Sequence, residues 1–263
     1  MLIIGELINS SRKSIRAAIE AQDVTSIQAV AEEQRKAGAD FIDVNAGVFV
    51  EQEDEYLKWL VSTVQESVDA PCCIDSPNPK AIKAALNVHQ GSAMINSISL
   101  EKGRYDDILP LVAGTDLKVV ALCISDKGIP QTVGERLTIA ENLINGLVKS
   151  NIPMGNIYVD PLVQPISTND EFGVKFLDAV EQIMTRFEGV HTICGLSNIS
   201  YGLPERRLLN QAFAVMAIGK GLDALIINPL DKRMMGHIVA TELLAGKDSF
   251  CEKYIKSYRD KKL

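Results

Sequence analysis

The segment LIIGEL at residues 2–7 is an almost unbroken apolar run of strand length, and the rest of the chain repeats its pattern. Seven further runs follow it: FIDVNA (41–46), PCCIDS (71–76), AMINSI (93–98), KVVALCI (118–124), NIYVDPL (156–162), HTICGL (191–196) and ALIINP (224–229). Nearly continuous apolar runs are typical of parallel strands that are covered on both faces. The sequence therefore predicts eight buried parallel strands.

Segments with helical periodicity separate these runs. Residues 24–38 carry apolar side chains on one helical face and end at Gly38, a common stop signal. Residues 79–89 begin with Pro79, which suits the first position of a helix. Residues 134–150 and 169–187 supply the crossovers after two later strands. Each of these segments predicts a helix on the outside of a parallel sheet.

Strand followed by helix, eight times over, predicts an α/β fold of the closed (β/α)8 barrel (TIM barrel) type. The chain has 263 residues, and such barrels usually take ~250, so we expect a single domain over residues 1–263. An open, doubly wound sheet is the alternative. Against it, no Gly-x-Gly-x-x-Gly motif follows the first strand.

Composition restricts the classes of partner. The net charge is −7, which argues against a surface that binds nucleic acid. No apolar run approaches the ~20 residues of a membrane span, and the N-terminal segment MLIIGELINS lacks the basic region of a signal peptide. We therefore expect a cytoplasmic protein with neither a nucleic-acid partner nor a membrane partner.

The cysteines and histidines do not form a metal-binding motif. There are five cysteines and three histidines, at Cys72, Cys73, Cys123, Cys194, Cys251, His89, His191 and His237. No Cys-x-x-Cys pair occurs, and the histidines are far apart in sequence. We expect buried thiols and no metal site.

Polar residues stand where the predicted strands end, which in a (β/α)8 barrel is the face that carries the chemistry. The residues in question are Glu6, Asn9, Asp43, Asn45, Asp75, Ser76, Asn96, Ser97, Ser125, Asp126, Asp160, Ser197, Asn198 and Asn228. Such residues often cap the following helix. Four of them are carboxylates that lie in or directly after apolar strands, namely Glu6, Asp43, Asp75 and Asp160, so these four would face the barrel mouth and need hydrogen-bond donors.

This set of acceptors suits a flat, donor-rich heterocycle. A carboxylate can accept two parallel hydrogen bonds from an amino group and the adjacent ring N–H, as in a 2-aminopyrimidinone. No glycine-rich phosphate loop is evident near the last two strands, which argues against a phosphorylated substrate. The residues by themselves predict a neutral or cationic heterocycle in the barrel mouth.

Seven ordered motifs carry a resemblance to a known family. They are GELINS (5–10), AGADFIDVNAG (37–47), CIDS (73–76), MINSIS (94–99), YVDPLV (158–163), GLSNIS (195–200) and GLDALI (221–226). The chain resembles, from residue 1 to residue 262, the pterin-binding methyltransferases that exchange methyl groups between tetrahydrofolate and corrinoid proteins. These are related to the folate domain of cobalamin-dependent methionine synthase and, more distantly, to dihydropteroate synthase.

The resemblance implies an enzyme that moves a methyl group between N5 of tetrahydrofolate and the cobalt of a corrinoid. Either direction is open: from 5-methyltetrahydrofolate to the corrinoid, or from the methylcorrinoid to tetrahydrofolate. No Asp-x-His-x-x-Gly corrinoid-binding motif occurs in the chain, so a separate corrinoid protein would carry that cofactor. The resemblance also implies a homodimer.

The resemblance assigns roles at the ligand. Asp75, Asn96 and Asp160 match the residues that hold the pyrimidine edge of the pterin. Asn198 matches the asparagine that approaches N5 and is the candidate catalytic residue. The alternative for Asn198 is a helix cap.

Further positions match the surroundings of the ligand. Gly195 and Ser197 shape the loop that carries Asn198, and Arg206 matches a basic position further along this loop. Asp43 and Glu6 match the polar floor of the cavity. All five are therefore candidate folate-binding residues.

Two positions depart from the family pattern. Leu7 stands where many relatives carry arginine, which leaves the charge balance around Glu6 open, and Tyr201 replaces a polar residue of some relatives. We expect Tyr201 and Asp223 to face the corrinoid.

Two other functions remain as alternatives. One is a dihydropteroate synthase-like enzyme, but PLVQPIST at 161–168 lacks the glycine-rich, lysine-bearing segment associated with that family. The other is a non-catalytic folate-binding protein, which would bind folate without transferring a methyl group to or from an added corrinoid protein.

Overall fold

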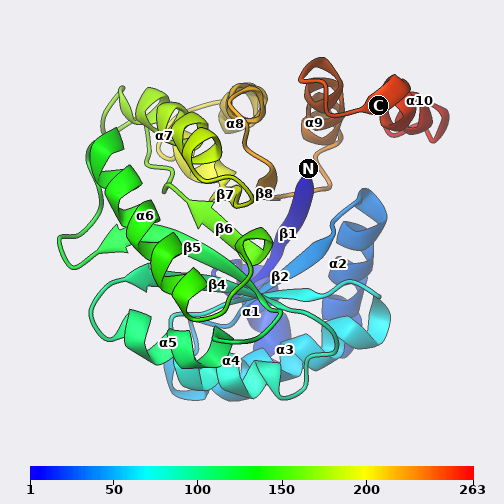
Figure 1. The fold of residues 1–263 in the computed structure, drawn as a ribbon. Coiled ribbons are helices and arrows are strands. Elements are labelled where there is room, and N and C mark those ends of the chain that lie inside the picture. The colour runs from blue at the N-terminus through cyan, green and yellow to red at the C-terminus, as the bar shows by residue number, and fades with distance from the viewer.

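The eight strands form a closed barrel in the order of the chain. The structure is a computed structural model that describes residues 1–263. All strand pairs are parallel, and β1 also pairs with β8, which closes the sheet (Figure 1). The strands are β1 (Leu2–Asn9), β2 (Phe41–Asn45), β3 (Cys72–Asp75), β4 (Met94–Leu100), β5 (Lys118–Ser125), β6 (Ile157–Asp160), β7 (His191–Gly195) and β8 (Ala224–Ile227). The prediction of a (β/α)8 barrel is confirmed.

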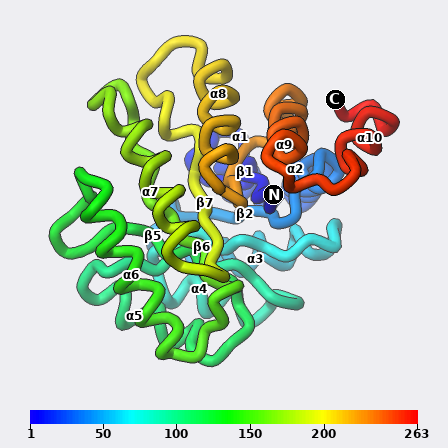
Figure 2. The backbone as a smooth tube through the Cα atoms, turned by 45° about the horizontal axis from the view of Figure 1, so that its top comes forward, coloured from blue at the N-terminus to red at the C-terminus, as the bar shows by residue number.

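Helices surround the barrel, as the tube in Figure 2 shows. They are α1 (Lys13–Glu20), α2 (Val24–Ala37), α3 (Glu53–Ser67), α4 (Pro79–Leu86), α5 (Arg104–Val112), α6 (Val133–Lys149), α7 (Phe172–Arg186), α8 (Arg206–Gly219), α9 (Lys232–Leu244) and α10 (Glu252–Arg259). Four short 3-10 helices lie in the loops: η1 (Val50–Gln52), η2 (Met154–Asn156), η3 (Leu196–Ser200) and η4 (Ser249–Cys251).

Local sequence signals set several helix ends as predicted. Gly38 closes α2 with a φ of 109°, a conformation that favours glycine. Pro79 occupies the start of α4, and Asn78 caps that helix by accepting a hydrogen bond from the backbone N–H of Lys80. The helix α1 was not predicted; its N-cap residue, Arg12, lies three residues after the end of β1.

The barrel interior is filled by a layer of inward-facing side chains. Its buried members are Ile4, Phe41, Cys73, Met94, Val120, Tyr158, Ile193 and Ala224, one from each strand. Two larger apolar clusters fill the space between the strands and the helices. The interior is thus a packed core, and any ligand must bind at its open end.

The cysteines are free thiols. Cys72, Cys73, Cys123 and Cys194 are buried, as predicted, but Cys251 is exposed in η4, where the expectation of burial was wrong. Burial raises the pKa of the Cys72 thiol to about 12.

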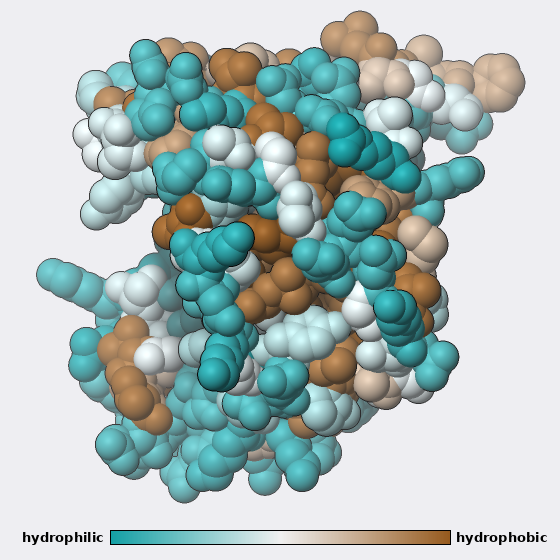
Figure 3. Space-filling view, turned by 60° about the vertical axis from the view of Figure 1, so that its left-hand side comes forward, coloured by the Kyte–Doolittle hydropathy of each residue, from teal (hydrophilic) through white to brown (hydrophobic).

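The molecular surface is mixed in polarity. Figure 3 shows one face on which hydrophilic side chains predominate, with hydrophobic side chains visible in a hollow near its centre. None of the helices combines the length and the hydrophobicity needed to cross a membrane. Trp59, on α3, is half-buried against the larger apolar cluster.

Candidate functional site

The carboxyl ends of β2, β3 and β4 bring three polar side chains together. Asp75 and Asn96 are direct neighbours in the β3–β4 register. Asn45 donates a hydrogen bond from Nδ2 to Oδ2 of Asp75 at 3.0 Å. Its own Oδ1 accepts hydrogen bonds from Ser10 Oγ at 2.9 Å and from the N–H of Gly47 at 3.1 Å. Asn45 is therefore held in place, and it orients the Asp75 carboxylate.

Asp43 lies deeper, within β2. Its side chain is buried, with 3% exposure, and its Oδ1 atom has no hydrogen-bond partner. Burial raises the pKa of Asp43 well above its usual value, and the negative charge of Asp75 raises this pKa further. A buried acceptor without a donor is costly unless a ligand supplies one. Asp43 thus adds a buried carboxyl oxygen without a donor to the β2 side of the mouth.

Asp160 ends β6 and faces the same mouth. It is buried, and its Oδ1 accepts a hydrogen bond from the N–H of Leu162 at 2.8 Å. Burial raises the pKa of Asp160 to about 7, although this hydrogen bond and the positive charge of Arg136 oppose the rise. Burial likewise raises the pKa of Asp75 to about 6. Ring N–H donors of a ligand would favour the ionised form of both carboxyl groups.

Arg104 belongs to this site, although the sequence analysis missed it. It begins α5 and donates from Nη2 to the backbone oxygen and to Oγ of Ser97, both at 3.2 Å. Its positive charge lowers the pKa of Asp75 against the effect of burial. The only sequence signal for Arg104 is a basic residue shortly after β4, because it lies four residues beyond the end of that strand.

The loop after β7 carries the candidate catalytic amide. Gly195 ends β7, and Asn198 lies exposed within η3. The Nδ2 atom of Asn198 lies 3.8 Å from the point that a Cβ on Gly195 would occupy, so the amide folds back toward the strand end. Neither η3 nor the following α8 has a side-chain cap. Asn198 is therefore free to meet a ligand rather than engaged as a helix cap.

Arg206 holds this loop in place. Its Nη2 donates to the backbone oxygen of Ser197 at 2.7 Å, and its Nε donates to Oγ of Ser200 at 3.1 Å. Its guanidinium also lies 5.9 Å from the ring centroid of Tyr201. Tyr201 itself is 65% exposed beside this loop. Arg206 thus ties the loop of Ser197 and Asn198 to the start of α8.

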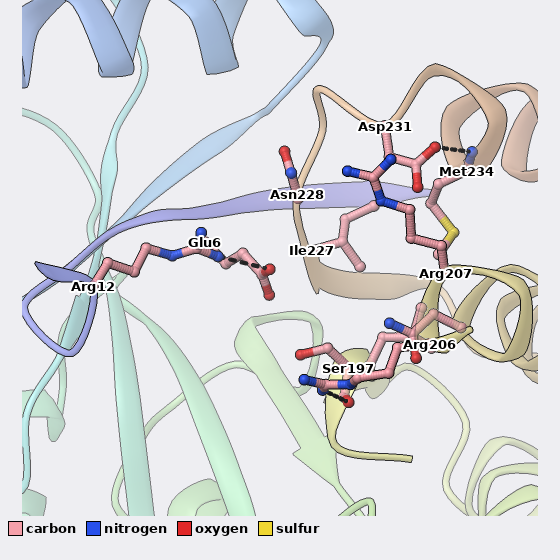
Figure 4. Close-up of a pocket in the computed structure, with 11 residues that line it drawn as sticks. Glu6, Arg12, Ser197, Arg206, Arg207, Ile227, Asn228, Asp231 and Met234 are labelled. Carbon is pink, nitrogen blue, oxygen red and sulfur yellow. Dashed lines mark hydrogen bonds and ion pairs between the residues drawn. The ribbon is translucent and has the colours of Figure 1, made fainter. Parts of the chain in front are cut away.

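Glu6 approaches the mouth from β1. It pairs with Arg12 at 3.2 Å, so Arg12 supplies a positive partner where Leu7 lacks one. Burial raises the pKa of Glu6, and the charges of Arg12 and Arg206 oppose that rise. Figure 4 shows Glu6 facing Ser197 and Arg206 across a pocket.

That pocket occupies the β7–β8–β1 side of the mouth and has a volume of about 270 Å³. It is lined by Glu6, Arg12, Leu196, Ser197, Arg206, Arg207, Asn210, Ile227, Asn228, Asp231 and Met234. The mouth therefore has an acidic side, with carboxyl groups on β2, β3 and β6, and a side that carries three arginines.

Asp223 does not reach this mouth, and its placement among the corrinoid-facing residues was wrong. It precedes β8, at the opposite end of the barrel. Its Oδ2 lies 2.6 Å from Nδ1 of His191, and its Oδ1 accepts a hydrogen bond from the N–H of Thr192 at 2.8 Å. Residues that precede the strands of such a barrel lie on the face away from the active site, where they contribute to stability.

The structure contains no cluster of three or more His, Cys, Asp or Glu side chains placed to hold a metal ion.

A (β/α)8 barrel with buried carboxyl groups and amides at its mouth has the features of an enzyme that binds a donor-rich ring. The chain matches the family described as pterin binding enzyme over residues 5–228, and it belongs to that family.

Two curated relatives narrow the class. The chain is 38% identical over 265 residues to a protein of Eubacterium limosum named methylcorrinoid:tetrahydrofolate methyltransferase, a match that covers 100% of this chain and 98% of that protein. It is 31% identical over 241 residues to methionine synthase of Mycobacterium tuberculosis, a match that covers 87% of this chain and 20% of that protein. The chain is therefore placed among the methyltransferases of the family.

Solved structures support the fold. A dihydropteroate synthase of Coxiella burnetii in complex with pteroic acid superposes with a TM-score of 0.73, 17% identity and coverage of 94% of both chains. A dihydropteroate synthase of Xanthomonas albilineans superposes with a TM-score of 0.68 and 17% identity, covering 92% of this chain and 91% of that one. At this identity the likeness establishes the shared barrel only.

Proposed function

We propose that the protein transfers a methyl group between N5 of tetrahydrofolate and the cobalt of a corrinoid that a separate protein carries. The observation that carries the proposal is the convergence of Asp75, Asn96 and Asp160 at one mouth of the barrel. The full-length similarity to a methylcorrinoid:tetrahydrofolate methyltransferase supports it. Because that relative's name puts the methyl group on the corrinoid first, we propose the direction from methylcorrinoid to tetrahydrofolate.

The acidic side of the mouth binds the pyrimidine edge of the pterin in this proposal. Asp75 and Asp160 accept hydrogen bonds from its amino group and ring N–H groups, and Asn96 offers both a donor and an acceptor. Asp43 lies beneath them with an acceptor that has no partner. The ring is thereby held with N5 toward the loop after β7.

Asn198 positions N5 in this proposal. In the direction toward tetrahydrofolate, its Oδ1 accepts a hydrogen bond from N5–H, which leaves the nitrogen lone pair directed at the methyl carbon. The new N5–CH3 bond forms as the cobalt–carbon bond breaks, its electron pair stays on the cobalt, and the N5 proton leaves to solvent. In the opposite direction the amide rotates and Nδ2 donates to N5 as its basicity develops. The corrinoid supplies the metal chemistry, and the chain supplies position.

The open rim of the mouth is the surface for the corrinoid protein in this proposal. Tyr201 lies there, 65% exposed and next to the loop of Asn198. An exposed aromatic ring suits contact with a large, flat macrocycle or with its protein carrier. Gly195 and Ser197 keep the loop close to the end of β7.

The experiment that tests the function is a single-turnover assay with purified protein, tetrahydrofolate and a methylated corrinoid protein. We expect 5-methyltetrahydrofolate to form while the visible absorbance of the corrinoid changes at the same rate. Omission of the chain is the control. Tight folate binding without methyl transfer would instead support a non-catalytic folate-binding protein.

A further inference from the structure

The pocket on the β7–β8–β1 side of the mouth differs in charge from the acidic side. Arg12, Arg206 and Arg207 all line it, together with Glu6 and Asp231 (Figure 4). In a chain with a net charge of −7, three arginines around one pocket are a local exception. A cluster of arginines in a concave site is typical of carboxylate or phosphate recognition.

Two of the three arginines already have partners. Arg12 pairs with Glu6 at 3.2 Å, and Arg206 donates to the backbone of Ser197. Arg207 forms neither a hydrogen bond nor an ion pair, and it is exposed in the pocket. The nearby carboxylate of Asp231 is engaged by the N–H of Met234 and does not pair with Arg207. Arg207 is thus the free cation of this pocket.

Asn210 adds a second unpartnered group. It lines the same pocket one helical turn after Arg206 on α8, and its Oδ1 atom is buried without a hydrogen-bond donor. A ligand that satisfies both groups must bring an anion for Arg207 and an N–H for Asn210. A carboxylate next to an amide N–H has this combination.

The chemistry of folate supplies such a group. The aminobenzoyl-glutamate tail is attached through the ring carbon next to N5, and it ends in an amide N–H flanked by a carboxylate. If N5 meets Asn198, the tail leaves the ring beside Ser197, which lines the arginine-bearing pocket. The acidic side of the mouth would repel the same carboxylates.

We propose that this pocket binds the glutamate end of the folate tail, with Arg207 as the residue that pairs with its carboxylate and Asn210 as the acceptor for its amide N–H. This inference rests on the proposed function, because it takes folate as the ligand. Arg12 adds positive charge at the opposite wall, beside Glu6. The pocket therefore favours folates with anionic tails over tail-free pterins.

Calorimetry with two probes tests the inference. The probes are tetrahydrofolate and 6-methyltetrahydropterin, which has the ring but lacks the tail. We expect Arg207→Gln to weaken tetrahydrofolate binding by about 10-fold, as the loss of a charged hydrogen bond implies, and to leave 6-methyltetrahydropterin binding unchanged. Arg207→Lys should retain part of the affinity. Arg186→Gln is the matched control, since Arg186 is exposed at the end of α7, away from the pocket.

The outcomes separate the two proposals. Suppose that the wild-type protein binds both probes. If Arg207→Gln then weakens the binding of both probes equally, or of neither probe, the proposed tail site is wrong and the proposed pterin site is unaffected. If the wild-type protein binds neither probe, the proposed function fails and the tail site fails with it. A tail-specific loss that shrinks at high salt, as expected for an exposed ion pair, supports the assignment.

Discussion

The side chain of Arg136, fully buried on α6, donates a hydrogen bond from Nε to the backbone oxygen of Pro161 at 2.8 Å. Pro161 directly follows Asp160, so Arg136 holds the chain as it leaves β6. Its Nη1 donates to the backbone oxygen of Thr132 at 3.3 Å, and its Nη2 has no partner. Arg136 is therefore a buried positive charge close to Asp160 without a direct ion pair.

From this arrangement we predict that Arg136→Gln raises the pKa of Asp160 above its value of about 7, because a charge that opposes the effect of burial is lost. Tetrahydrofolate affinity should then fall more at pH 7 than at pH 9. The measurement is the dissociation constant against pH, with Arg136→Lys as the charge-retaining control. A uniform loss across pH would show that Arg136 only supports the fold.

The pyrimidine-edge assignment predicts the effect of removing either carboxylate. Asp75→Ala or Asp160→Ala should weaken tetrahydrofolate binding by ~10-fold or more, since each removes charged hydrogen bonds. Calorimetry measures this directly, and an Asp116→Ala variant, changed at an exposed position before β5 at the opposite end of the barrel, is the control. Unchanged affinity in both variants would contradict the assignment.

Asn198 should affect the rate of methyl transfer more than binding. We predict that Asn198→Ala lowers single-turnover transfer by ~10²-fold, comparable to the loss of one well-placed hydrogen-bonding group. Folate affinity should fall less, because the contact strengthens mainly as the N5–methyl bond is made or broken. Thermal unfolding is the control. A lowered melting temperature with normal transfer would mean that Asn198 has a structural role.

Burial of Asp160 predicts a pH-dependent stability. Its pKa is about 7 in the folded protein and lower in the unfolded chain, so the folded state binds the extra proton between about pH 4 and pH 7. The part of the free energy of unfolding that comes from protonated Asp160 is therefore present at low pH and is lost as pH rises through this window. Asp160→Asn should gain stability relative to wild type as pH rises from 4 to 8. Urea unfolding at both pH values measures the difference, and a constant difference would contradict the prediction.

The resemblance to the family predicts a homodimer. Light scattering at micromolar concentration should give a mass near twice the 28.7 kDa of the chain. Exposed apolar side chains on adjacent outer helices, such as Val174 on α7 and Met216 on α8, would lose solvent contact in such an assembly. A mass of 28.7 kDa would show a monomer.

The sequence alone determined the barrel and the acidic side of its mouth. Apolar runs of strand length predict buried parallel strands because both faces of each strand need cover. Gly38 and Pro79 set helix ends through backbone geometry, which is local. The sequence predicts that Asp75, Asn96 and Asp160 lie close together, because the strand ends of a parallel barrel converge whatever the conformation of the loops.

Only the tertiary structure decided which helix and loop residues reach the mouth. Arg104, Arg136 and Arg207 lie on helices, and periodicity predicts the face of a helix but not its neighbours. How the helices pack decides that Arg104 and Arg136 come near Asp75 and Asp160, and that Arg207 lines the pocket. Asp223 shows the converse. It lies in GLDALI (221–226), a motif that matches the family, but it precedes β8 at the end of the barrel away from the mouth and pairs with His191. Helical and strand periodicity depends on residues that are close in sequence. The charge around a carboxylate depends on side chains that are distant in sequence and come together only when the barrel closes.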